Sequence, residues 1–458
     1  METMNFSGYT HRFLARIVIE AKTPFAVGSG EKDILTDALV ATDVNGLPYI
    51  PGTAIAGVVR HMIGEEQAKS FFGYQSDDGR GSQVIFSEAK ILNSQGQVVD
   101  GLSLDASNDT LLKPYYGGLP IRQHVRINGR GVTDKAGKFD EQIVFAGTRF
   151  CFEMEMVAAK DELSKFNLVL QQLQNKAFRI GGGTRCGFGK IEIVELYTSQ
   201  LDLTKNEDLE LYLGKSSKLS KPWNGWGKAE EVQDRAEGWT QYKLTLTPED
   251  FFLFGSGFGD DEADMTPVKE KKVVWSDGKG KLSDDLVLIP ATSVKGALAH
   301  RTAFHWNRIN HYYAGSTEAK VGKDNPAVKA LFGSEGEKGK DSKMVNQIRG
   351  NLLFSDVIGK LLPDKVLNHV AIDRFTGGAM GGALFSEKTT FGKGQSFELV
   401  ILASTAVLEK DEDVREAFEA ALKDICNGML PLGGGINRGN GVFKGTLTKD
   451  GKQVELKL

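Results

Sequence analysis

Two stretches of the chain place apolar side chains at the three- and four-residue spacing of an amphipathic helix. The later stretch carries them at Val414, Ala417, Phe418, Ala421, Leu422 and Ile425. The earlier stretch carries them at Leu163, Phe166, Leu170 and Leu173. Each stretch is followed by a cluster of glycines and then by a short apolar strand. The pattern therefore predicts the same helix, loop and strand twice.

Four further features also occur twice and in the same order. They are a Gly-Ser-Gly loop with aspartates, an Ile-Pro turn before a helix, a strand ending in Phe-Ser and an acidic residue, and two strands joined by a glycine-rich excursion. In the first copy they begin at Gly28, Tyr49, Phe71 and His124, and in the second at Gly255, Leu288, Leu331 and His369. Thr53 and Ser293 are the expected N-terminal caps of the helices after Ile-Pro. Repetition of the whole series indicates an internal duplication.

The chain therefore divides into two copies of one unit. We expect a first domain at 1–212, a polar linker at 213–238 and a second domain at 239–458, within the size range of ordinary domains. In each copy the order is strand, helix, strand, hairpin, helix, glycine loop, strand. That order predicts an α+β fold with two tandem ferredoxin-like domains, each carrying an inserted hairpin.

Composition narrows the classes of partner. The chain is 40% apolar and 25% charged with a net charge of −4, so any contact with nucleic acid must come from local basic patches. The cysteines, Cys151, Cys186 and Cys426, are far apart, which argues for a reducing cytoplasmic location and against a disulfide framework or a zinc knuckle. The longest apolar run, which begins at Leu399, is too short to span a membrane.

The glycine clusters read "IGGGTRCGFGK" from Ile180 and "LGGGINRGNG" from Leu432. A dinucleotide-binding fingerprint is excluded, because here the helix precedes the glycines and the strand follows them. One or two glycines would suit a helix C-terminal turn. A longer cluster with an arginine in each copy, Arg185 and Arg438, favours close approach of a phosphate backbone. Further candidate phosphate contacts are Arg122, Arg126 and Arg130, for which the alternative is a solvated charged face.

The acidic loops carry Asp33 and Asp37 in the first copy and Asp260 and Asp264 in the second, at the same spacing from Gly-Ser-Gly. A single such pair would be read as turn residues. Repetition of the pair favours carboxylates that hold a divalent metal or orient an attacking hydroxyl. The repeated His124 and His369 are expected to have packing or hydrogen-bonding roles.

Together, "VGSG", "IPGTAIAGVVR" and "IGGGTRCGFGK" resemble the RAMP superfamily of CRISPR–Cas systems, and "IPATSVKGALAHR" and "LGGGINRGNG" resemble it again. The chain is most similar to the tandem backbone subunit of type III-D effector complexes. The resemblance implies an RRM-like core in each half and a "thumb" hairpin after His124 and His369. It also implies binding of CRISPR RNA, cleavage of complementary target RNA with a divalent metal (Mg2+ or Mn2+), and other effector subunits as partners.

The family's catalytic aspartate lies just before the strand that leads into Ile-Pro-Gly. Asp37 matches this position best and Asp33 second. Asp264 matches when counted from Gly-Ser-Gly, but counting back from Ile289-Pro290 leads to the neighbourhood of Lys271. We therefore expect Asp37 and Asp264 to hold the metal, and cleavage of the target at one or two sites. The expected RNA contacts are Gly182, Gly183, Arg185, Gly434, Gly435, Arg438, Lys295 and Arg60.

The sequence is also compatible with two other functions. The chain could be a non-catalytic subunit that only holds guide RNA, in which case the aspartates would not lie at the scissile phosphate. A repeat-processing endonuclease would be expected to use a histidine base, and no close pair of histidines is repeated.

Overall fold

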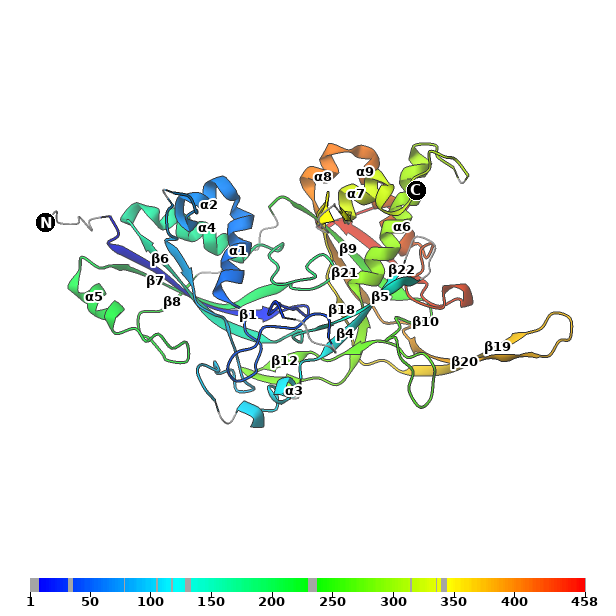
Figure 1. The fold of residues 1–458 in the computed structure, drawn as a ribbon, viewed down its shortest axis with the longest axis horizontal. Helices are drawn as coiled ribbons and strands as arrows, with labels where there is room; N and C mark the ends of the chain where they lie inside the picture. Colours follow the sequence, from blue (N-terminus) through cyan, green and yellow to red (C-terminus); the bar gives the residue numbers. More distant parts are fainter. Residues whose placement is uncertain are drawn as a thin grey trace.

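The computed structural model describes residues 8–31, 36–77, 79–103, 106–116, 118–127, 133–229, 237–313, 315–334, 336–338 and 344–457. Two large hydrophobic cores organise them, one in each half of the chain (Figure 1), and a small third cluster consists of Val18, Leu92 and Cys151. The fold is α+β, with antiparallel sheets and helices packed on them.

The first half is built on an antiparallel sheet in the order β2-β6-β1-β7-β8. Its strands are β1 (His11–Ala21), β2 (Val84–Phe86), β6 (Arg149–Ala158), β7 (Ile191–Asp202) and β8 (Gly227–Lys228), and β3 (Lys90–Ile91) also pairs with β6. Its helices are α1 (Gly52–Ile63), α2 (Glu65–Phe72), α3 (Lys113–Tyr116), α4 (Leu163–Leu173) and α5 (Asn206–Leu213). Figure 1 shows α1, α2 and α4 together on one face of this sheet.

The second half repeats the plan, with a sheet in the order β17-β21-β9-β22-β23. Its strands are β9 (Trp239–Pro248), β17 (Leu352–Leu353), β21 (Phe397–Ser404), β22 (Phe443–Lys449) and β23 (Lys452–Gln453). The helices are α6 (Ala291–Ile309), α7 (Pro326–Phe332), α8 (Thr405–Lys410) and α9 (Glu412–Cys426). Strands β9, β21 and β22 thus occupy the places that β1, β6 and β7 have in the first half.

The predicted apolar stripes form the contact between helices and sheets. All six stripe positions of α9 are buried, as are Phe166, Leu170 and Leu173 of α4. Strand β9 alternates between partly exposed and buried residues along its whole length, as expected for a strand with one face on a core. The duplication and the helix positions predicted from the sequence are confirmed.

The predicted helix caps are wrong. Helices α1 and α6 begin at Gly52 and Ala291, directly after proline, and no side chain of the preceding residue caps either one. Thr53 and Ser293 therefore lie inside the first turn. In α6 the first amide, that of Ala291, instead donates to the distant carboxylate of Asp356 at 2.7 Å.

A long hairpin projects from each half. The first consists of β4 (Ile121–Ile127) and β5 (Thr133–Gln142), and the second of β19 (Asp364–Ile372) and β20 (Ala379–Phe391), with β10 (Phe251–Phe252) pairing on β20. In Figure 1 the first hairpin runs from its own half toward the second half, whereas β19 and β20 extend beyond the second half. The hairpins have the place in the chain expected for the thumbs.

An insertion in the second half joins the two halves. After β11 (Lys269–Glu270), the chain forms a hairpin of β12 (Val273–Ser276) and β13 (Lys279–Leu282) before β14 (Leu286–Ile289), which pairs with β18 (Val357–Ile358). Val273 is buried in the core of the first half, and Trp275 Nε1 donates to the carbonyl of Gly147 at 2.7 Å. The described part of the expected linker packs back on the first half, where β8 pairs with β7.

A buried group of three charges connects the same two halves. Arg122, at the base of the first hairpin, pairs with Glu270 and with Asp356 of the second half, and all three side chains are buried. Burial alone would lower the pKa of Arg122, but the two carboxylates raise it above its usual value, so the arginine stays charged. Arg122 is therefore not the phosphate contact that the sequence suggested. Arg130 lies outside the described residues, and so does the side chain of Arg126.

Leucine is the residue at the matching place in the second hairpin (Leu367). Replacing Arg122 by leucine should lower the free energy of unfolding by about 3–5 kcal/mol, because two buried carboxylates lose their cation. Urea unfolding measures the loss. Arg415→Leu, at an exposed pair with Glu412, is the control and should cost at most about 1 kcal/mol. The combined variant Arg122→Leu/Glu270→Gln/Asp356→Asn should recover most of the stability. A variant Arg122→Leu as stable as the wild type would contradict this role.

Candidate functional site

In the first half, the acidic loop is fixed to the base of the thumb hairpin. The carboxylate of Asp37 accepts a hydrogen bond from the backbone N–H of Asp140 at 3.2 Å, and the carboxylate of Asp140 accepts one from the N–H of Asp37 at 3.1 Å. The next residue, Ala38, forms a parallel β-bridge with Glu141 of β5. Asp37 is thus held at the point where the hairpin leaves the domain. Asp33 lies outside the described residues.

In the second half, Asp264 makes the matching contacts. Its carboxylate accepts from the backbone N–H of Ser386 at 2.8 Å and from the Ser386 hydroxyl at 3.0 Å. Met265, the next residue, forms a parallel bridge with Glu387 of β20. The hydrogen bonds from Ser386 lower the pKa of Asp264, so its carboxylate stays ionised.

Asp264 therefore occupies the place of Asp37, and the count from Gly-Ser-Gly gives the right correspondence. The count from Ile289-Pro290, which led to Lys271, is wrong. The reason is the β12–β13 hairpin, which lies between the acidic loop and the Ile-Pro turn and lengthens only the second copy.

Asp260 has a different environment. Its carboxylate accepts from the backbone N–H groups of Glu262 and Ala263, both at 2.9 Å, and pairs with Lys388 at 2.5 Å. The hydrogen bond from Lys388 is the main cause of a lowered pKa for Asp260. In the first half the place of Lys388 is taken by Gln142, whose side-chain oxygen accepts a hydrogen bond from the N–H of Val40. Asp260 thus serves as a turn residue paired with Lys388, and among the described aspartates of the two acidic loops the shared geometry is that of Asp37 and Asp264.

The repeated histidines hold the thumbs together. His124 lies 2.9 Å from Glu141 and His369 lies 3.1 Å from Glu387, in both cases as close contacts without hydrogen-bond alignment. Each imidazole also stacks on a phenylalanine of the returning strand, Phe139 or Phe385. These contacts agree with the packing role expected from the sequence.

The glycine loop of the second half is tied to the thumb by a buried carboxylate. Glu387, with a fully buried side chain, pairs with Arg438 and accepts from the amide of Asn440 at 3.2 Å. Burial would raise the pKa of Glu387, but Arg438 and His369 lower it, so Glu387 remains charged. The charge of Arg438 is therefore engaged within the protein. Counted from Gly433, moreover, Arg438 corresponds to Cys186 and not to Arg185.

The glycines of both loops approach the chain's own backbone. The N–H of Gly182 donates to Ala26 at 2.8 Å, and the N–H of Gly434 donates to Leu253 at 2.7 Å. A side chain at Gly181 would place its Cβ 2.3 Å from the Ala26 carbonyl. These two amides are consequently not free for a phosphate, which leaves Gly183 and Gly435 as the candidates.

The first glycine loop lies in a different electrostatic setting, where cations from both halves gather. Arg185 donates to the carbonyl of Gly350 at 2.9 Å, Lys295 lies 3.8 Å from the Cys186 sulfur, and Arg349 lies 2.7 Å from His61. We call Arg185, Lys295, Arg349 and His61 the basic cluster. Burial first, and then the charge of Arg349, lower the pKa of Arg185 to about 10.

No carboxylate of the described residues pairs with Arg185, Lys295 or Arg349. Arg60, next to the cluster, is instead paired with Glu65 at 2.9 Å. The sequence singled out Arg185 and Lys295, and the structure brings them together. The sequence analysis missed His61 and Arg349, because these residues are 288 positions apart in the chain and meet only in the folded structure.

The described acidic residues do not form a complete metal cage. Among the described residues, no group of three His, Cys, Asp or Glu side chains is arranged to hold a metal ion. Asp37 with Asp140 offers two neighbouring carboxylates, and Asp264 offers one beside a serine hydroxyl. Such a set suits Mg2+ only in the binding mode where substrate phosphates and water complete the coordination.

Both halves of the chain match the same protein family. The model of the RAMP superfamily matches residues 18–192 and 275–444, well over half of the chain and one region in each half. The chain belongs to the RAMP superfamily. Its two matched regions make it a tandem RAMP protein, and membership indicates a subunit of a CRISPR-associated complex. A search of curated proteins found no match. Among the described helices of this RAMP protein, none combines the length and apolarity needed to cross a bilayer.

Replacing Arg438 by leucine should destabilise the second half by about 1.5–3 kcal/mol, because Glu387 loses its main charged partner. Thermal and urea unfolding measure the effect. Adding Glu387→Gln should restore much of the stability. Arg185→Leu is the control within the other glycine loop, and should cost about 1 kcal/mol or less. Equal stability of the two single variants would show that Arg438 has no such structural role.

Proposed function

We propose that this chain is the tandem backbone subunit of a type III CRISPR effector complex of the III-D kind, which binds CRISPR RNA and cleaves complementary target RNA. The observation that carries the proposal is the matching attachment of Asp37 and Asp264 to the bases of two projecting hairpins. The strand orders β2-β6-β1-β7 and β17-β21-β9-β22 support a ferredoxin-like core in each half.

Guide RNA is assigned to the basic cluster. RNA carries one negative charge per phosphate, and cations without carboxylate partners lose little when they bind it. The cluster joins the first glycine loop to helix α6 of the second half, so a backbone bound there would contact both halves. Because base pairing supplies sequence specificity, shape and charge are sufficient for this grip.

The second thumb has the surface expected of a wedge between bases. Four apolar side chains on or near its tip are strongly exposed: Phe375 at 98%, Leu384 at 72%, Ile372 at 61% and Met380 at 52%. Apolar and aromatic side chains can stack on unpaired bases. The tip of the first thumb lies outside the described residues.

Cleavage is assigned to the RNA segment displaced beside each thumb. There the 2′-oxygen would attack the adjacent phosphorus while the bond to the 5′-oxygen breaks. The proton of the 2′-hydroxyl passes to the leaving oxygen, and the products are a 2′,3′-cyclic phosphate and a 5′-hydroxyl. The carboxylates of Asp37 and Asp264 can accept a hydrogen bond from the 2′-hydroxyl and orient it. A divalent cation, Mg2+ or Mn2+, when bound would stabilise the charge on phosphorus.

A second candidate is a guide-binding subunit without catalysis. The hydrogen bonds of Asp37 and Asp264 to thumb backbone favour it, because the same contacts would be expected of residues that only anchor the acidic loops.

Substitution by asparagine separates the two functions, since an asparagine oxygen still accepts from the backbone but carries no charge. If the aspartates are catalytic, Asp37→Asn should abolish one cut and Asp264→Asn another, each by at least about 100-fold in rate. Single-turnover cleavage of one labelled target RNA by the assembled complex measures both. Asp161→Asn, remote from both loops in sequence, is the control and should leave the ladder unchanged. A full ladder from both variants would favour the non-catalytic subunit.

Guide retention tests the basic cluster. The variant Arg185→Gln/Arg349→Gln should bind CRISPR RNA at least about tenfold more weakly, and the salt dependence of binding should become less steep. Filter binding over a range of salt concentrations measures both effects. Arg12→Gln/Arg415→Gln removes the same charge elsewhere and serves as control. Equal weakening by both variants would mean that only net charge matters.

A further inference from the structure

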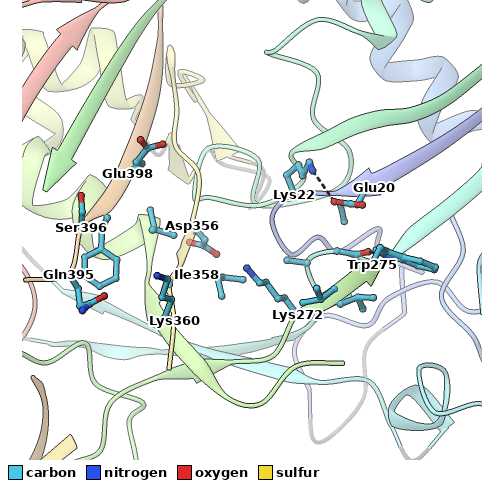
Figure 2. A pocket seen from close by; sticks show the side chains of 18 of the residues that line it. Glu20, Lys22, Lys272, Trp275, Asp356, Ile358, Lys360, Gln395, Ser396 and Glu398 are labelled. Atoms are coloured by element: carbon cyan, nitrogen blue, oxygen red, sulfur yellow. Dashed lines mark hydrogen bonds and ion pairs between the residues drawn. The ribbon is translucent and has the colours of Figure 1, made fainter. Parts of the chain in front are cut away.

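A polar cavity of about 1060 Å3 lies between the two halves (Figure 2). Its walls come from the end of β1, the turn before β6, strand β12, the segment around β18 and the turn before β21. No residue of the acidic loops or glycine loops lines it. The cavity is therefore separate from the site described above.

The carboxylates at the cavity are already neutralised. Glu20 accepts from Lys22 at 2.8 Å and from Arg149 at 2.9 Å. Asp356 pairs with Arg122 and caps helix α6. Glu398, at the rim, lies 2.6 Å from Lys243. None of these acids leaves a charge without a partner.

Two lysines of the lining are not neutralised. Lys272 and Lys360 have no carboxylate partner among the described residues. Lys272 is half-buried, and Figure 2 shows its ammonium group directed away from Trp275 and toward Ile358 and Lys360. Lys360 is exposed, so an anion can approach its side chain from solvent. Among the described residues, the lining of the cavity thus carries more basic than acidic side chains.

The inserted hairpin creates and stiffens this cavity. Lys272 immediately precedes β12, whose Val273 N–H donates to Ala146 at 2.8 Å and whose Trp275 donates to Gly147. In the first half a short turn from Asp43 to Gly46 stands in place of the insertion, with Thr42 bridged to Pro48. The cavity is consequently a feature of the joint between the halves and not of either repeat.

We propose that this cavity binds a ligand with two or more phosphate groups, contacted by Lys272 and Lys360. Lysine binds phosphate as a point charge, and the lysines come from separate walls, as suits a ligand with more than one anionic group. The side chains of Gln395 and Ser396 add neutral hydrogen-bonding groups at the same opening. A volume of about 1060 Å3 accommodates a nucleotide or a short piece of RNA backbone.

The proposal is tested by equilibrium binding of the full chain to three probes. The probes are ATP, inorganic tripolyphosphate and a short single-stranded RNA. The variant Lys272→Gln/Lys360→Gln is compared with Lys323→Gln/Lys410→Gln, which removes two exposed lysines elsewhere. At least one probe should bind the wild type and the control at least about tenfold more tightly than the cavity variant. Thermal unfolding of all three proteins checks that the substitutions leave the fold intact.

The three probes distinguish the source of the phosphates. A loss confined to ATP and tripolyphosphate identifies a site for free nucleotides. A loss for RNA identifies a contact with RNA backbone beyond the basic cluster. Either outcome supports a phosphate site. The proposal is overturned if the wild type binds none of the probes, or if the cavity variant binds all three as the wild type does.

Discussion

The buried pairing of Arg122 with Glu270 and Asp356 fixes how the two halves meet. Asp356 also holds the first amide of helix α6, and the Gly187 carbonyl of the first glycine loop accepts from the Asp356 N–H. One residue, Asp356, therefore sets three elements relative to one another: its carboxylate holds the thumb base and the helix start, and its backbone N–H holds the glycine loop. Because an unpaired charge in that place would be costly, the halves have little freedom to move apart or rotate.

This joint is a head-to-tail contact between two related units, in which different surfaces of each unit meet. The thumb and glycine loop of the first half meet the helix start and insertion of the second half. The basic cluster and the cavity both lie along that boundary. The charge available for polyanions is thus produced by the joining of the halves, although the whole chain has a net charge of only −4.

The acidic loops illustrate how a loop residue gains a defined position. Asp37 and Asp264 are each anchored by hydrogen bonds to the returning strand of a hairpin, and the next residue extends that contact as a β-bridge. An aspartate on a free loop would sample many positions, and ordering it on binding would cost conformational entropy. The anchored position is compatible with orienting a substrate group, and equally with holding the thumb in place.

The sequence by itself determined the duplication, the order of elements, the buried stripes of α4 and α9 and the superfamily motifs. These depend on local periodicity and on residues close together in the chain. Only the tertiary structure decided which of the described arginines pair with a carboxylate. Arg438 and Arg185 look alike in sequence, yet the first is paired with Glu387 and the second is not paired with any described carboxylate. Arg122 finds its partners 148 and 234 residues away. The physical reason is that a charge is neutralised by whatever packing brings beside it, and contacts between distant segments leave no periodic signal in the chain.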